Sequence, residues 1–130
     1  MSPNGLWVAS GCNDETVHMW QLSGKDAGAE LTCGGYSSSP TVLAWSSDSA
    51  LLATAGGAAV SVWRFAGAAG SPAGSTPVTC LPRGRGGGDV TAMAFHPTLP
   101  LLAVGATAGV ITVYSVVTHV PAASLGVRLA

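Results

Sequence analysis

The stretch LWVASGCNDETVHMWQL, residues 6–22, decides how the rest of the chain is interpreted. It aligns without a gap with PLLAVGATAGVITVYSV, residues 100–116, at an offset of 94. A third stretch, ALLATAGGAAVSVWRF at residues 50–65, matches both with one residue fewer in its central turn. A segment that recurs at long, similar intervals is the signature of a repeat architecture. The alignment therefore predicts three copies of one structural unit.

Each copy alternates apolar and polar residues with a period of two, as in Val60, Ser61 and Val62, which is typical of β-strands. The second and third copies also carry an upstream strand, in TVLAWSSDSALLA from Thr41 and VTAMAFHPTLPLLA from Val90. Equivalent residues lie 43 to 51 positions apart, close to the length of a four-stranded antiparallel unit. The sequence predicts an all-β fold with units at about residues 6–33, 41–82 and 90–125.

This set of copies resembles the WD-repeat family. ASGCNDETVHMW, residues 9–20, fits the family pattern of a small residue, Ser-Gly, a turn Asp, Thr-Val and a closing Trp. LAWSSDSALLATAGGAAVSVW and AFHPTLPLLAVGATAGVITVY, residues 43–63 and 94–114, fit it more loosely. The resemblance covers about residues 6–120 and implies a β-propeller. Because closed propellers typically have four to eight blades, we expect a partial WD-repeat propeller of about two and a half to three blades, a fragment or terminal part of a larger one.

In the family, a Ser or Thr, a turn Asp, a strand Trp and an upstream His form a hydrogen-bonded tetrad. The resemblance carries these structural positions onto Ser10, Asp14 and Trp20 in the first unit, Thr54 and Trp63 in the second, and Tyr114 in the third. Several family residues are replaced. Ala58 stands for the second Asp, GGYSSS lacks the upstream His, and Val104 and Ala108 occupy the Ser and Asp positions of the third unit. No complete tetrad is implied. In the first turn, Asn13 is expected to take the positive φ that such turns need.

Composition excludes several classes of partner. Only 8% of the 130 residues are charged and the formal net charge is −1, which argues against nucleic acid and anionic membranes. LLAVGATAGVITVYSVV, residues 101–117, is apolar enough for a membrane helix. Its glycines, its β-branched residues and its alignment with the other copies favour a strand instead. We therefore expect no nucleic acid and no membrane.

The sequence offers no grouping typical of catalysis or metal binding. Cys12, Cys33 and Cys80 are widely spaced, without a Cys-x-x-Cys pair, and are expected to be reduced. Asp14 and Glu15 are adjacent carboxylates in a turn, where solvation is the expected state. No Gly-x-Ser-x-Gly motif is present, although a Ser-His-Asp set would be spatial and not sequential. The sequence predicts no enzyme, no cofactor and no metal.

The leading hypothesis is a non-catalytic protein–protein interaction scaffold, because loops on a rigid body are where binding concentrates. Flexible loops are expected at residues 66–77, which are rich in Gly, Ala, Ser and Pro, and at residues 83–89, with the sequence RGRGGGD. Candidate partner-binding residues lie in turns and loops: Asn13, Glu15, Ser47, Asp48, Arg83, Arg85 and His96.

Two alternatives remain open at this point. The blades have a purely structural role in a propeller whose binding face lies elsewhere, or the chain is a propeller enzyme or a metal-binding propeller. Other proteins, missing propeller blades and a second copy of the chain are the expected partners. Self-association would use an apolar face of the last unit with Leu102, Ile111 and Val113. The expected location is the cytoplasm, because the N-terminus lacks a signal peptide pattern, with a nuclear or organellar location left open.

Overall fold

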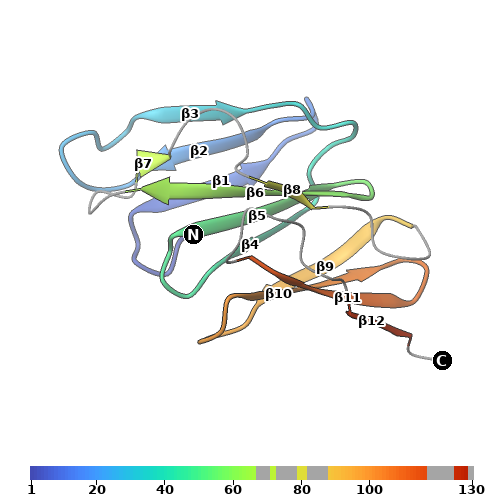
Figure 1. Ribbon diagram of the computed structural model, residues 1–130. Coiled ribbons are helices and arrows are strands. Elements are labelled where there is room, and N and C mark those ends of the chain that lie inside the picture. The colour runs from blue at the N-terminus through green and yellow to red at the C-terminus, as the bar shows by residue number, and fades with distance from the viewer. Residues whose placement is uncertain (67–70, 73–78, 82–87, 117–124, 129–130) are drawn as a thin grey trace.

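The computed structural model describes residues 1–66, 71–72, 79–81, 88–116 and 125–128. These residues form strands joined by turns and loops, and none of them lies in a helix. The strands gather into three antiparallel sheets that follow one another along the chain (Figure 1). The predicted all-β fold is confirmed. In the described part of the chain, no helix of the length and apolarity needed for a membrane span is found.

The first sheet contains β1 (Trp7–Gly11), β2 (Val17–Gln21) and β3 (Glu30–Cys33), in that order. The β1–β2 turn is closed by the amide of Cys12, which donates to the carbonyl of Thr16. The positive φ of this turn lies at Glu15, at 65°, and the expectation for Asn13 was wrong. Glu15 takes this left-handed conformation two residues before β2 begins at Val17. Gly109, 94 positions later, does the same with a φ of 74°.

The second sheet begins with β4 (Val42–Trp45), β5 (Leu51–Gly56) and β6 (Ala59–Ala66). Two short strands, β7 (Ser71–Pro72) and β8 (Thr79–Leu81), both pair with β6 and share its outer edge. The fourth strand of the predicted unit is thus divided in two. β7 also falls inside the stretch 66–77 that was expected to be a loop.

The third sheet has the plain four-stranded order β12-β11-β10-β9. Its strands are β9 (Val90–Phe95), β10 (Leu101–Ala106), β11 (Val110–Ser115) and β12 (Leu125–Arg128). The strand registers reproduce the sequence alignment: Val8 pairs with Trp20, Leu52 with Trp63, and Leu102 with Tyr114.

The sheets are stacked, and both faces of the middle sheet are covered. Towards the first sheet, the core consists of Trp7, Val17, Met19, Cys33, Leu52, Trp63 and Phe65. Towards the third sheet, it consists of Ala53, Ala55, Val60, Val62, Val90, Leu102, Val104 and Tyr114. Stacking is how a repeat buries faces that it cannot bury alone. The middle sheet therefore depends on both neighbours.

The two-residue period of a strand determines which side chains share one face of the sheet. Leu102 pairs with Tyr114 and lies on the same face of the third sheet, so it is fully buried against the second. The expectation that Leu102 lies on an exposed outer face was wrong. Ile111 and Val113 alternate with the buried Thr112 and Tyr114 on β11, which places them on the opposite face.

Candidate functional site

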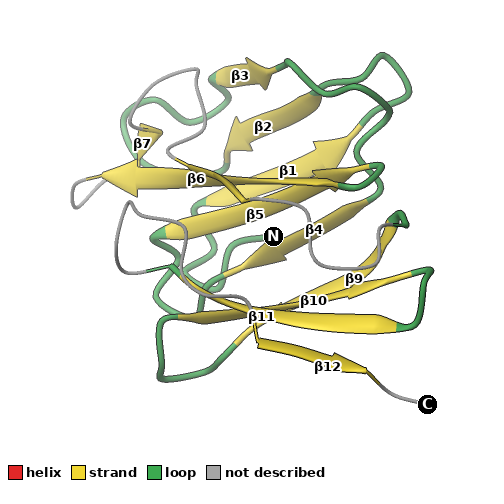
Figure 2. Ribbon diagram, turned by 45° about the vertical axis from the view of Figure 1, so that its right-hand side comes forward, coloured by secondary structure: helices red, strands yellow, loops and turns green. Residues whose placement is uncertain are grey.

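The turns of the three sheets collect at two opposite ends of the strands. Figure 2 shows the β4–β5 and β9–β10 turns at one side, and the β5–β6 and β10–β11 turns at the other. The β1–β2 turn belongs to the second group. Gly11 at the end of β1 and Gly56 at the end of β5 lie against the same segment before β4, at Pro40 and Ser38. The predicted contact residues are therefore divided. Ser47, Asp48 and His96 lie at one end, Asn13 and Glu15 lie at the other, and Arg83 and Arg85 lie outside the described residues.

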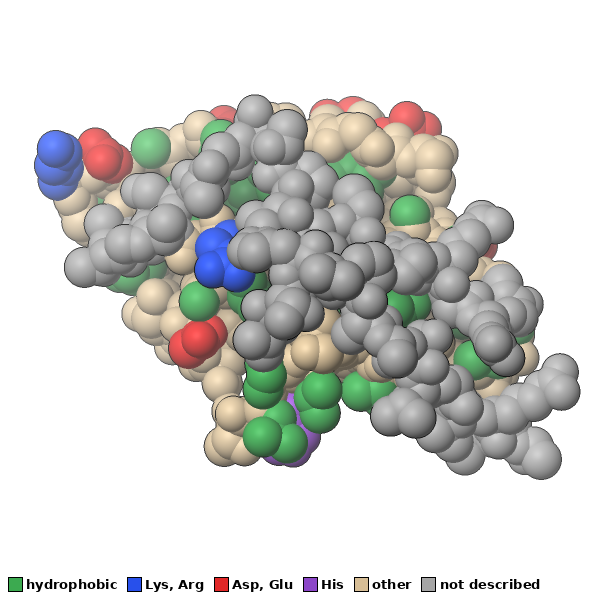
Figure 3. Space-filling model, in the orientation of Figure 1, with side chains coloured by type: hydrophobic (Ala, Val, Ile, Leu, Met, Phe, Trp, Pro, Cys, Tyr) green, Lys and Arg blue, Asp and Glu red, His purple; other side chains and the backbone are tan. Residues whose placement is uncertain are grey.

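A groove of about 530 Å³ lies between the second and third sheets at the first of these ends. Its polar lining is Ser46, Ser47, Asp48, Arg64, His96 and Thr98. Its apolar lining includes Leu51, Phe65, Phe95, Leu99, Pro100 and Val116. Figure 3 shows hydrophobic side chains beside a histidine at the lower margin of the molecule, where the β9–β10 turn lies. The fold thus joins three of the seven predicted contact residues in one concave surface.

The β4–β5 turn is held by its own side chains. The Asp48 carboxylate accepts hydrogen bonds from the Ser46 hydroxyl at 2.6 Å and from the Ala50 amide at 3.0 Å. The same Ser46 oxygen accepts from the Leu51 amide at 2.9 Å. The Ser46 bond and then the Ala50 bond lower the pKa of Asp48. Asp48 therefore presents a fixed negative charge at the groove.

The β9–β10 turn is ordered around His96. Its Nδ1 accepts hydrogen bonds from the amides of Thr98, at 3.1 Å, and Leu99, at 2.9 Å. The Ser47 hydroxyl donates to the carbonyl of Pro97 at 2.7 Å and ties this turn to the β4–β5 turn. The two walls of the groove are therefore connected directly.

The groove contains serine, aspartate and histidine, but their contacts do not form a catalytic relay. A relay needs an Nδ1–H that donates to the carboxylate and an Nε2 that accepts from the serine. Here Nδ1 of His96 accepts two backbone N–H groups, Asp48 accepts from Ser46, and Ser47 donates to a carbonyl. The side chains of Ser47, Asp48 and His96 therefore stabilise the two turns and make no hydrogen bonds with one another.

The second unit contains a polar network that the sequence did not reveal. Nε1 of Trp63 lies 3.0 Å from both the Thr54 Oγ1 and the Tyr36 hydroxyl, and those two oxygens lie 2.6 Å apart. Thr54 and Trp63 are the positions carried over from the family. Tyr36 belongs to GGYSSS, where the family histidine is missing. The sequence signal for this network was Tyr36 itself, an aromatic residue with a hydroxyl group in the segment where the family has its histidine.

The other two units use the family positions differently. Oδ1 of Asp14 accepts from the amide and hydroxyl of Thr16, and its Oδ2 lies 3.5 Å from Nε2 of His18. Ser10 is exposed, and no hydrogen bond joins it to Trp20 within the part of the chain that the structure describes. Trp20 instead stacks on His18, with ring centroids 5.8 Å apart. Tyr114 is buried in the third unit, and this burial raises the pKa of its hydroxyl.

Comparisons with known proteins agree with this geometry. The family model of the WD domain, G-beta repeat, matches residues 1–21 and 75–115. The crystal structure of the Cps50 (Swd1) beta-propeller domain from Myceliophteria thermophila has a TM-score of 0.76 at 22% sequence identity. That match covers 98% of this chain and 37% of the solved chain. No curated protein matches the chain.

The three stacked antiparallel sheets are consecutive blades of a β-propeller, and together they make a partial propeller. The matches to the family model and to a solved WD-type β-propeller support the WD-repeat family for this chain. WD-repeat propellers generally bind other proteins.

Proposed function

We propose that this chain is a non-catalytic protein-interaction scaffold and that its binding surface is the groove between the second and third blades. The observation that carries this proposal is Leu99, which is 52% exposed at a groove that combines apolar and polar lining residues. A large apolar side chain at a concave surface costs solvation free energy until a partner covers it. The groove is therefore a suitable anchor site.

The charges at the groove support a peptide partner. Among the described residues, the ion pairs join His18 to Asp14 and Glu30, so Asp48 and Arg64 have no ion-pair partner there. Protein interfaces combine an apolar centre with a polar rim, and a groove of this volume holds a few side chains. We propose an extended segment with one apolar anchor against Leu99 and polar groups that face Asp48 and Arg64.

The rigidity of the walls also supports this role. The bonds of Asp48, His96 and Ser47 fix both turns before any partner arrives. A preformed site loses less conformational entropy on binding than a mobile one. These same bonds occupy the groups that a hydrolase would need, which supports a binding role over catalysis.

The test is to select binders from a display library of random peptides on the purified chain, and to map them by NMR on the isotope-labelled protein. We expect the selected peptides to share an apolar residue and to shift the amide signals of Ser47, Arg64 and Thr98. Peptides that shift only the signals of Asn13 and Glu15, at the opposite end, would contradict the proposal.

We also propose that these blades complete a larger propeller. Two observations support this second role. Ile111 and Val113 lie on the face of the third blade that points away from the second, and the match with the Cps50 (Swd1) structure covers only 37% of the solved chain. Sedimentation velocity at several concentrations tests it. Self-association that weakens in Val113→Glu is expected, and a concentration-independent monomer would contradict it.

A cytoplasmic location is likewise a proposal. Cys12 and Cys33 form no disulfide in the described structure, and free thiols are typical of reducing compartments. Fluorescence microscopy of the tagged chain tests it, and a signal confined to the secretory pathway would contradict it.

A further inference from the structure

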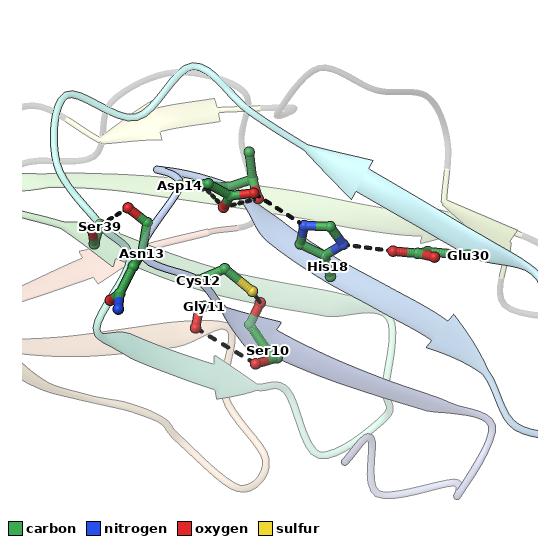
Figure 4. Close-up of polar contacts among 9 residues, drawn as sticks. Ser10, Gly11, Cys12, Asn13, Asp14, His18, Glu30 and Ser39 are labelled. Atoms are coloured by element: carbon green, nitrogen blue, oxygen red, sulfur yellow. Dashed lines mark hydrogen bonds and ion pairs between the residues drawn. The ribbon is translucent and has the colours of Figure 1, made fainter.

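The β1–β2 turn gathers three side chains of different chemistry that are distant from the groove. Cys12 and Asp14 lie in the turn, and His18 is the second residue of β2. One thiol, one carboxylate and one imidazole atom from these residues all lie within 4.8 Å of one another. Figure 4 shows the three side chains grouped at the β1–β2 turn and the start of β2, at one end of the first blade. Thiolate and imidazole are the ligands preferred by zinc and similar transition metals.

Glu30 holds the imidazole in the orientation that a metal site needs. Its Oε1 lies 2.6 Å from Nδ1 of His18, across the β2–β3 pair. The other ring nitrogen, Nε2, faces the Asp14 carboxylate (Figure 4). Histidine ligands of metals almost always donate their second N–H to a carboxylate, carbonyl or water. His18 is thus arranged as a ligand through Nε2, with Glu30 as its outer partner.

Asp14 is anchored in the same way. Its Oδ1 accepts from the Thr16 amide at 3.2 Å and from the Thr16 hydroxyl at 2.5 Å. Its Oδ2 is thereby directed at Nε2 of His18, 3.5 Å away. Two ligands of a tetrahedral zinc ion lie about 3.4 Å apart when their bonds to zinc are about 2.05 Å. The separation of these two atoms already fits a shared ion.

We propose that Cys12, Asp14 and His18 bind a zinc ion, with Glu30 orienting His18 and the fourth position open to water or to a partner's ligand. The Sγ of Cys12, now 3.7 Å from the carbonyl of Ser10, turns towards the other two ligands. The thiol gives its proton to solvent and binds as thiolate, while His18 binds in its neutral form. Because the turn stands at the opposite end from the groove, the site is independent of the proposed peptide site.

Cobalt(II) provides the probe, because it replaces zinc and gives a thiolate-to-cobalt charge-transfer band and visible bands when tetrahedral. The full chain is titrated with cobalt and then with zinc in the presence of a phosphine reductant. We expect one equivalent to bind with a charge-transfer band, and zinc to displace it. Cys12→Ser should abolish the band, and His18→Gln should weaken binding by more than tenfold.

Two further variants separate a built site from a surface coincidence. Glu30→Gln should weaken zinc binding about 10- to 100-fold, as is usual for outer partners of metal ligands. Glu15→Gln, a matched change in the same turn, should leave the affinity unchanged. Circular dichroism melts confirm that each variant is folded. The proposal is overturned if the chain gives no charge-transfer band, if the band persists in Cys12→Ser, or if Glu30→Gln and Glu15→Gln bind equally.

Discussion

Nε1 of Trp63 donates a hydrogen bond to Oγ1 of Thr54, 3.0 Å away, in the contact between the first and second blades. Thr54 is fully buried and Trp63 is 2% exposed. The Tyr36 hydroxyl contacts both atoms and extends this polar network inside an apolar layer. A buried polar group without a partner is costly. The network therefore allows the indole to seal the layer without leaving its N–H unsatisfied.

The first prediction concerns this network. Thr54→Val keeps the side-chain shape but removes the hydroxyl that Trp63 and Tyr36 share, so it should lower the free energy of unfolding by about 1–3 kcal/mol. Thr32→Val is the matched control, because Thr32 is exposed on β3. Urea denaturation measures both variants. Equal stabilities would show that the network contributes nothing.

The second prediction concerns the close approach of β1 to the segment before β4. A Cβ on Gly11 would clash with the carbonyl oxygen of Pro40, whereas one on Gly34 would meet nothing within 4 Å. Gly11→Ala should therefore cost about 1–3 kcal/mol in overpacking, and Gly34→Ala should cost much less. Thermal melts of the two variants decide this. A Gly11→Ala protein as stable as the Gly34→Ala protein would place Pro40 elsewhere.

The third prediction uses the left-handed residue of the first turn. Glu15 has a φ of 65°, a conformation that costs a non-glycine residue about 1–2 kcal/mol. Glu15→Gly should stabilise the chain by about 1 kcal/mol, and Gly109→Ala should destabilise it by a similar amount. Chemical denaturation compares the pair. Destabilisation by both changes would mean that the two turns do not share a conformation.

The fourth prediction concerns acid sensitivity. The hydrogen bond from Ser46, followed by that from Ala50, lowers the pKa of Asp48 below its ordinary value of 3.8 in the folded chain. Its stabilising effect is therefore complete above that value and is lost as the pH falls through the folded pKa. NMR titration of the Asp48 carboxyl should show an upward pKa shift in Ser46→Ala. An unchanged pKa would exclude the Ser46 bond as the cause.

The two-residue period and the aligned copies predicted much of the fold. Equivalent residues such as Trp63 and Tyr114 occupy equivalent strand positions, because the register follows directly from the repeat. The burial of Leu102 was missed because the two-residue alternation divides the side chains between two faces of a sheet but does not show which face packs against the adjacent blade. The division of the outer strand into β7 and β8 had no sequence signal.

The candidate site was predicted only as a set of turn residues. Ser47, Asp48 and His96 meet because sheet stacking places the β4–β5 turn beside the β9–β10 turn, 50 residues later in the sequence. The contact of Tyr36 with Trp63 depends on how the segment between β3 and β4 is placed. The cluster of Cys12, Asp14 and His18 depends on the directions of side chains across the β1–β2 hairpin. Such proximity is not encoded in any local spacing, and so it required the structure.

The affinity of a groove-selected peptide for two leucine variants tests whether the groove is the protein-binding surface. Leu99, 52% exposed, lines the groove, whereas Leu22, 44% exposed, is not among its lining residues. Fluorescence anisotropy titrations should give an affinity at least about tenfold weaker for Leu99→Asp, a loss of about 1.4 kcal/mol, and an unchanged affinity for Leu22→Asp. Equal affinities for the two variants would contradict the assignment of the groove as the protein-binding surface.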